Sequence, residues 1–184
     1  MEANDYQAAA ARTLIDEPDT TFTNDELAIM LAALELGAAT AKLLEFCKKG
    51  ICHRHGFDTT KALELVGDCD IKVYDMHRTI EGDYIRHSQY QLSGNDQMLI
   101  WCALGLGGEA GEVMETISLL SDSVISHEAL VKELGDGMWY NAALCTLIGV
   151  PMRDVMQANI DKLKKRFPDG WGSEASKARI DTQV

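Results

Sequence analysis

Apolar residues recur along most of this chain at intervals of three and four, which is the spacing of one face of an α-helix. The runs cover residues 5–12, 25–49, 60–80, 97–120, 127–148 and 151–167. Only three prolines occur among the 184 residues, so long helices are not interrupted. The pattern therefore predicts an all-α protein.

Helix start and stop signals agree with these runs. Thr23 or Asn24 is expected to cap the second helix, and a cap for the third lies within 58–60. Gly149 is expected to end one helix and Pro151 to begin the next. The tail after Trp171 is expected to be loosely ordered.

Charge and cysteine content narrow the class of protein. A net charge of -12 argues against a nucleic-acid binder, which needs a basic face to displace counterions. The five cysteines are odd in number and three lie in apolar helical patterns, which indicates free thiols in a reducing cytoplasm. No signal peptide is expected, and no stretch is expected to be apolar enough to span a membrane.

Two parts of the chain echo each other in order. Residues 33–37 (ALELG) precede 103–107 (ALGLG) by 70 positions, and 64–68 (ELVGD) echoes 133–136 (ELGD). Tyr6-Gln7 and Tyr90-Gln91 are candidate starts of the two copies. The order predicts two copies of one helical unit.

Four acidic residues of the second copy have the spacing of a metal site. Glu109 and Glu112 are three apart, and so are Glu133 and Asp136 on the next predicted helix. Two antiparallel helices can close such pairs around a hard cation, and oxygen-only ligation suits Mg²⁺ or Mn²⁺. Glycines beside these acids suggest that something approaches the backbone closely. The alternative is two ordinary solvated acid pairs.

Three separated strings then carry a family resemblance. Residues 104–113 (LGLGGEAGEV), 133–140 (ELGDGMWY) and 159–171 (NIDKLKKRFPDGW) together resemble the MazG-like nucleotide pyrophosphohydrolases, closely over about 97–172. The resemblance implies an all-α, Mg²⁺-dependent enzyme that hydrolyses nucleoside triphosphates, dNTPs in particular, to monophosphate and pyrophosphate. It implies a role in nucleotide-pool control and, since several short relatives are phage-encoded, a possible phage origin.

The same resemblance implies roles for individual residues. Glu109, Glu112, Glu133 and Asp136 resemble the metal ligands. Tyr140 matches a position that contacts the nucleotide, and the last helix offers candidate phosphate contacts, which are Asn159, Lys162 and Arg166. Many relatives have an additional acid where this chain has Gly108, so the general base is left unassigned.

The first half resembles the family in degenerate form. Ala39 and Lys42 stand where Glu109 and Glu112 stand, and of the acids only Asp68 survives, in the place of Asp136. We therefore expect domains at 1–88 (degenerate, without metal), 89–172 (catalytic) and 173–184 (tail), packed as a pseudo-dimeric helical bundle. Lys48 and Lys49 are candidates to reach the substrate phosphates from the first copy, or are ordinary loop charges. Two such chains are expected to be able to pair as a homodimer.

Two alternative functions remain, one of them an enzyme and the other of a different class. One is a dUTPase-like enzyme that also accepts diphosphates, and another is a catalytically silent helical interaction module. A zinc site at Cys47, Cys52, His53 and His55 is disfavoured because their spacing matches no common zinc pattern.

Overall fold

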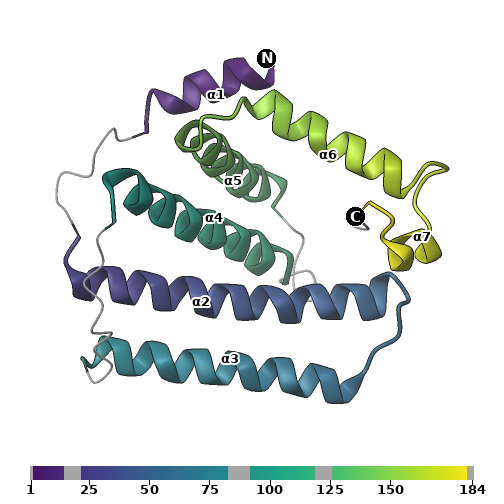
Figure 1. The fold of residues 1–184 in the computed structure, drawn as a ribbon, viewed down its shortest axis with the longest axis horizontal. Coiled ribbons are helices and arrows are strands. Elements are labelled where there is room, and N and C mark those ends of the chain that lie inside the picture. Colours follow the sequence, from purple (N-terminus) through teal and green to yellow (C-terminus); the bar gives the residue numbers. More distant parts are fainter. Residues whose placement is uncertain (1, 15–21, 83–91, 119–125, 182–184) are drawn as a thin grey trace. The chain divides into compact units, whose positions relative to one another are not determined.

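The computed structural model describes residues 2–14, 22–82, 92–118 and 126–181. Every regular element in these residues is helical, so the all-α prediction is confirmed. The elements in chain order are α1 Ala3–Ala11, α2 Asn24–Cys47, the π-helix η1 Lys48–Cys52, α3 Thr59–Ile80, α4 Gly94–Ser118, α5 His127–Leu147, α6 Met152–Arg166 and α7 Ser173–Ala178 (Figure 1).

Capping boxes begin both of the longest helices. At the start of α2, Thr23 Oγ1 accepts a hydrogen bond from the Glu26 amide (3.2 Å), and the Thr23 amide donates to Glu26 Oε2 (2.8 Å). Ser93 and Asp96 make the same reciprocal pair at the start of α4, with distances of 3.2 and 3.0 Å. The predicted cap at Thr23 is confirmed, and the two boxes lie 70 residues apart.

Contacts divide the chain into two compact units that interleave its two halves. Unit 1 comprises Met1–Leu34 and Arg86–Arg153, and unit 2 comprises Glu35–Ile85 and Asp154–Val184. Of the three boundaries along the chain, one falls inside α2 and another in the first turn of α6. The expected division into copies at 1–88 and 89–172 concerns repetition in the sequence and stays a prediction; Tyr90-Gln91 lies outside the described residues.

In unit 1, α5 packs against both α4 and α1 (Figure 1). Small side chains allow this close approach, because Cys102, Ala142 and Ala143 are almost completely buried. Gln7 fixes α1 by polar contacts: its Nε2 donates to the Val150 carbonyl (3.1 Å), and its Oε1 accepts from the Met152 amide (2.6 Å). This arrangement holds α5, which carries two of the predicted site acids, from two sides.

In unit 2, the later part of α2 runs beside α3, and Lys72 Nζ of α3 pairs with Glu35 Oε2 of α2 at 2.9 Å. The loop after η1 folds back so tightly that a Cβ at Gly50 would lie 3.0 Å from Phe57 Cδ2. Asp58 caps α3 by accepting from the Lys61 amide (3.1 Å), as predicted.

The expectation of a loosely ordered tail after Trp171 is wrong. Residues Ser173–Ala178 form α7, and Asp181 beyond it makes a nearly buried ion pair. The sequence contains a helical signal that the apolar pattern misses. This short segment has little apolar periodicity, but Glu174 in its first turn pairs with Lys177 at 2.9 Å.

The expectation that no segment is apolar enough to span a membrane is also corrected. Asn24–Cys52, which joins α2 and η1, is long and apolar enough by length and composition. Core helices of water-soluble proteins pass the same test, so it carries no membrane assignment. Within this stretch, Glu35 and Lys42 line a cavity with residues of α3.

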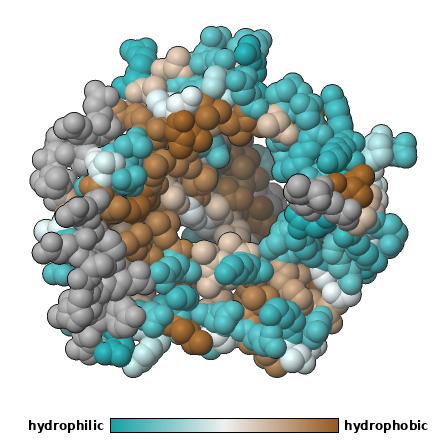
Figure 2. Space-filling view, viewed as in Figure 1, coloured by the Kyte–Doolittle hydropathy of each residue, from teal (hydrophilic) through white to brown (hydrophobic). Residues whose placement is uncertain are grey.

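Apolar side chains remain exposed on several helices. The exposed fraction is 67% for Val131 on α5 and 66% for Leu63 on α3, and α6 buries none of its residues. Figure 2 shows hydrophobic surface gathered over α4 and α5. The predicted pairing of two chains would cover such surface and stays a prediction.

Candidate metal centre

Three acidic side chains from α4 and α5 converge in unit 1. One carboxylate oxygen from each of Glu109, Glu133 and Asp136 lies within 4.8 Å of the other two. The helices approach each other closely here: a Cβ at Gly137 of α5 would lie 3.8 Å from Glu109 Cβ of α4. The described residues contain no second such group, so Cys47, Cys52, His53 and His55 do not form one.

Glu112, the fourth predicted acid, is exposed and lies outside this triad. Its charge nevertheless acts on the triad. It contributes to raising the pKa of Glu109 and of Glu133. The structure thus brings three of the four predicted acids together and leaves the fourth at the edge.

Uncompensated negative charge dominates the centre. Burial raises the pKa of Glu109, with Glu112 and Asp136 adding to the effect, and burial followed by the neighbouring acids raises the pKa of Glu133. Among the residues that the structure describes, no lysine, arginine or histidine forms an ion pair with any of the four acids. An oxygen-only donor set that lacks a protein cation fits a hard divalent ion.

Tyr140 of α5 lies one helical turn after Asp136, and its side chain packs against α4. Its ring covers Gly105 so closely that a Cβ at position 105 would lie 2.1 Å from Tyr140 Cζ. Burial and then the charge of Glu109 raise the pKa of the Tyr140 hydroxyl. Gly105 is therefore the close approach that the glycine-rich string of α4 predicted, and the side chain that approaches is Tyr140.

An aromatic cluster continues from Tyr140 on the same two helices. Ring centroids are 5.0 Å apart for Trp139 and Tyr140, 5.9 Å for Trp101 and Tyr140, and 6.0 Å for Trp101 and Trp139. Trp139 Nε1 donates to Thr13 Oγ1 at 2.8 Å, just beyond α1. The three rings pack edge-to-face on one another and join α4 to α5 next to the centre.

Sequence analysis missed two residues that support this centre. Thr13 holds Trp139, and the Tyr6 hydroxyl donates to the Gly135 carbonyl (3.4 Å), between Glu133 and Asp136. Each contact joins residues more than 120 positions apart. No local pattern marks such pairs, so the sequence held no signal for them.

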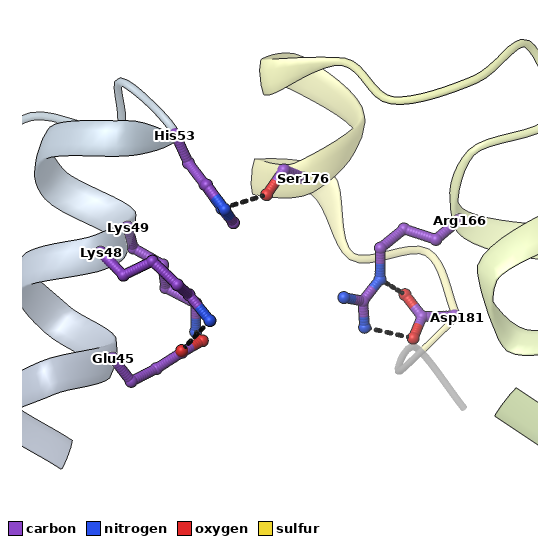
Figure 3. A network of polar contacts seen from close by, with 7 residues as sticks. All are labelled: Glu45, Lys48, Lys49, His53, Arg166, Ser176 and Asp181. Atoms are coloured by element: carbon purple, nitrogen blue, oxygen red, sulfur yellow. Dashed lines mark hydrogen bonds and ion pairs between the residues drawn. The ribbon is translucent and has the colours of Figure 1, made fainter. Parts of the chain in front are cut away.

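The other predicted contacts belong to unit 2. Asn159 and Lys162 are exposed on α6, and Arg166 pairs with Asp181. Lys48 and Lys49 both pair with Glu45, and their hydrogen bonds lower the pKa of Glu45 to about 2 (Figure 3). Three of the predicted cationic contacts therefore already have carboxylate partners.

A cavity of about 360 Å³ lies between α2 and α3. Its lining includes Ala39, Lys42 and Asp68, the three residues expected to stand in the places of Glu109, Glu112 and Asp136. Glu35 and Lys72 line it as well. The charges around this cavity are mixed, unlike those of the centre between α4 and α5.

Comparisons with known proteins identify a family domain whose residues include the centre in unit 1. Residues 101–171 match the model of the MazG nucleotide pyrophosphohydrolase domain. The Gene 37 protein of Mycobacterium phage L5 is 39% identical over 78 residues, which cover 39% of this chain and 68% of the phage protein. No solved structure matches the chain. The chain therefore belongs to the MazG nucleotide pyrophosphohydrolases, and its domain holds all four predicted acids.

Proposed function

We propose that this protein hydrolyses nucleoside triphosphates, preferring dNTPs, to nucleoside monophosphate and pyrophosphate, with Mg²⁺ as cofactor. The observation that supports this most directly is the convergence of Glu109, Glu133 and Asp136 within a MazG domain. Mn²⁺ is the alternative ion, because it accepts the same ligands. In a cell, this activity would adjust the pool of nucleotides.

Glu109, Glu112, Glu133 and Asp136 would hold the ion. When bound, it supplies positive charge to the triphosphate and lowers the pKa of water. Glu109, Glu133 and Asp136 already converge, and Glu112 at the edge of the triad would complete the set of ligands. Gly108 offers no side chain, so we assign no general base.

Tyr140 would contact the nucleotide. Its ring lies against Gly105, and its hydroxyl, whose pKa burial and Glu109 raise further above neutral, can donate a hydrogen bond at neutral pH. A rigid ring places that donor at little entropic cost. The adjoining Trp101 and Trp139 keep the ring in place.

Asn159, Lys162 and Arg166 would contact the phosphates from α6. Lys162 is exposed, and no ion pair is recorded for it among the described residues, so it can reach an anion freely. Lys48 and Lys49 would first have to leave Glu45, which makes them the weaker candidates. Their double substitution to alanine without loss of affinity for the triphosphate would remove them from the site.

The test is pyrophosphate release from a panel of NTPs and dNTPs with Mg²⁺. Glu133→Gln and Asp136→Asn should abolish turnover. Glu115→Gln is the matched control, because Glu115 is an exposed acid one turn beyond Glu112 on the same helix. Turnover that survives both site substitutions would disprove the proposed centre.

Nucleoside diphosphates belong in the same panel. Release of monophosphate and inorganic phosphate from dUDP would favour the dUTPase-like activity over the one proposed. Folded protein without turnover on any nucleotide would favour the helical interaction module.

A further inference from the structure

The C-terminal segment 173–181 is anchored on the loop that follows η1. Ser173 Oγ donates to the His53 carbonyl (2.6 Å). Ser176 Oγ lies 3.3 Å from His53 Nδ1 (Figure 3). Ser176 is 6% exposed, and the Trp171 ring meets the His53 ring edge-on at 5.8 Å. These contacts give α7 a defined place within unit 2.

Beyond α7, the Asp181 carboxylate forms an ion pair with the guanidinium of Arg166. Arg166 Nε donates to Asp181 Oδ1 and Nη2 donates to Oδ2, each at 2.5 Å (Figure 3). The Asp181 side chain is 1% exposed and that of Arg166 is 17% exposed. This two-pronged geometry is the one by which arginine also binds phosphate, so the carboxylate and a phosphate compete for the same donors.

The turn that delivers Asp181 is conformationally unfavourable. Arg179 ends α7 with φ 46° and ψ 46°, in the left-handed region that disfavours residues with a Cβ. The ion pair of Asp181 with Arg166 therefore forms at the cost of an unfavourable backbone conformation at Arg179. A turn held by one strong contact against an opposing backbone preference can release when a competitor takes that contact.

We propose that residues 173–181 form a latch in which Asp181 is an internal competitor for the phosphate groups of the substrate at Arg166. The latch rests on the phosphate-binding role of Arg166 that belongs to the proposed function. Only the fraction of molecules with the latch open binds substrate fully, so the latch raises the apparent KM by the inverse of that fraction. It leaves kcat unchanged, because the carboxylates of α4 and α5 are not involved.

The first experiment compares KM and kcat for a triphosphate substrate in full-length variants. Asp181→Asn removes the charge of the latch and should lower KM by about tenfold without changing kcat. Asp181→Ala should behave alike, and thermal melts verify that both variants are folded. Glu174→Gln is the matched control, since Glu174 is an exposed acid of the same segment that pairs only locally, with Lys177.

A double-mutant comparison of Asp181 and Arg166 distinguishes a latch from a general effect of the charge on Asp181. Arg166→Gln should raise KM, and adding Asp181→Asn to it should have no further effect, because the residue for which Asp181 competes is gone. If Asp181→Asn lowers KM equally in both backgrounds, Asp181 acts by long-range repulsion and the latch is wrong.

A second readout does not depend on turnover. Trypsin can cleave after Lys177 and Arg179, both within the latch, and after the exposed Lys61 on α3 as an internal reference. A non-hydrolysable triphosphate analogue with Mg²⁺ should speed cleavage in the latch but not at Lys61. Asp181→Asn should show that faster cleavage without any nucleotide.

The outcomes distinguish the latch from the proposed function. If Arg166→Gln raises KM while Asp181→Asn changes neither KM nor the cleavage rate, the latch is wrong and the role of Arg166 stands. If Arg166→Gln leaves KM unchanged, both the role of Arg166 and the latch are wrong. If neither the wild type nor Asp181→Asn turns over any nucleotide, the proposed function fails and takes the latch with it.

Discussion

The helical pairs α4–α5 and α2–α3 begin in the same way and differ where their helices face each other. Capping boxes start α4 and α2, and the single caps Ser126 and Asp58 start α5 and α3. In α4–α5, the Tyr140 ring covers Gly105, whereas Glu35 and Lys72 form an ion pair in α2–α3. The two helical pairs thus share the same kinds of helix cap but differ in the side chains between their helices.

The difference in charge is the more instructive part. Between α4 and α5, acids gather without a cationic partner among the described residues, and burial together with the neighbouring acids raises the pKa of Glu109 and Glu133. Between α2 and α3, Lys42 and Lys72 face Glu35 and Asp68 around one cavity. A divalent ion is favoured by the first arrangement and not by the second, because only the first leaves its negative charge uncompensated.

The largest expected effect contrasts equivalent aspartates in the two pairs. Asp136→Asn should lower kcat/KM for a triphosphate by at least about 100-fold, since it removes a proposed ligand directly. Asp68→Asn, at the corresponding place on α3, should change kcat/KM by less than about twofold. Steady-state pyrophosphate release measures both. A large loss of kcat/KM in the Asp68→Asn variant would show that the two aspartates do not differ in role.

The next effect concerns the contact between Gly105 and Tyr140. Gly105→Ala places a methyl group 2.1 Å from the Tyr140 ring, so it should lower the free energy of unfolding by about 1–3 kcal/mol. Gly107→Ala is the control on the same helix. Nothing lies within 4 Å of its Cβ, and the better helix former should stabilise by about 0.5–1 kcal/mol. Urea denaturation of both variants decides whether close packing, rather than helix propensity, explains Gly105.

A third effect depends on pH. Raised pKa values mean that the folded state binds protons more tightly than the unfolded state at Glu109 and Glu133. Without metal, stability should fall as pH rises from about 4 through the raised pKa values. Millimolar Mg²⁺ should raise Tm only above that range, where both carboxylates are ionised. An equal rise in Tm at about pH 4, or in the Glu133→Gln variant, would place the ion elsewhere.

The smallest effect lies at the end of α2. Glu45→Gln should cost less than about 1 kcal/mol, because its pairs with Lys48 and Lys49 are largely exposed. The low pKa of Glu45 means that its contribution is present above the unfolded value of 4.5 and is lost as pH falls towards about 2. Urea denaturation at neutral and acidic pH measures this. A cost that persists at the acidic limit would show that the charge is not its source.

The sequence predicted features that depend on neighbours within one helix. The helical spans follow from apolar spacing, and the pairing of Glu133 with Asp136 follows from a separation of three residues. Apart from the convergence of acids from α4 and α5, contacts between distant residues escaped prediction. The supports from Tyr6 and Thr13, and the contact of Asp181 with Arg166, join segments that carry no shared local pattern.

Glu112 shows, within the site itself, what spacing along the sequence cannot predict. Its spacing from Glu109 predicted a common face, yet it is exposed at the edge while its neighbour joins the triad. Helical spacing fixes direction along one helix only. The crossing of α4 over α5 decides which carboxylates meet, and that crossing is set by small side chains such as Ala142 and Ala143.

The Tyr140 ring against Gly105 also constrains how this chain can evolve. Any side chain at position 105 displaces the ring, and loss of the ring leaves a gap over the glycine. Neither residue can therefore change first without cost, so replacements at the two positions should arise together across relatives. In a library that randomises both positions, the folded survivors should be correlated pairs, among them charged pairs of the kind that Glu35 and Lys72 form.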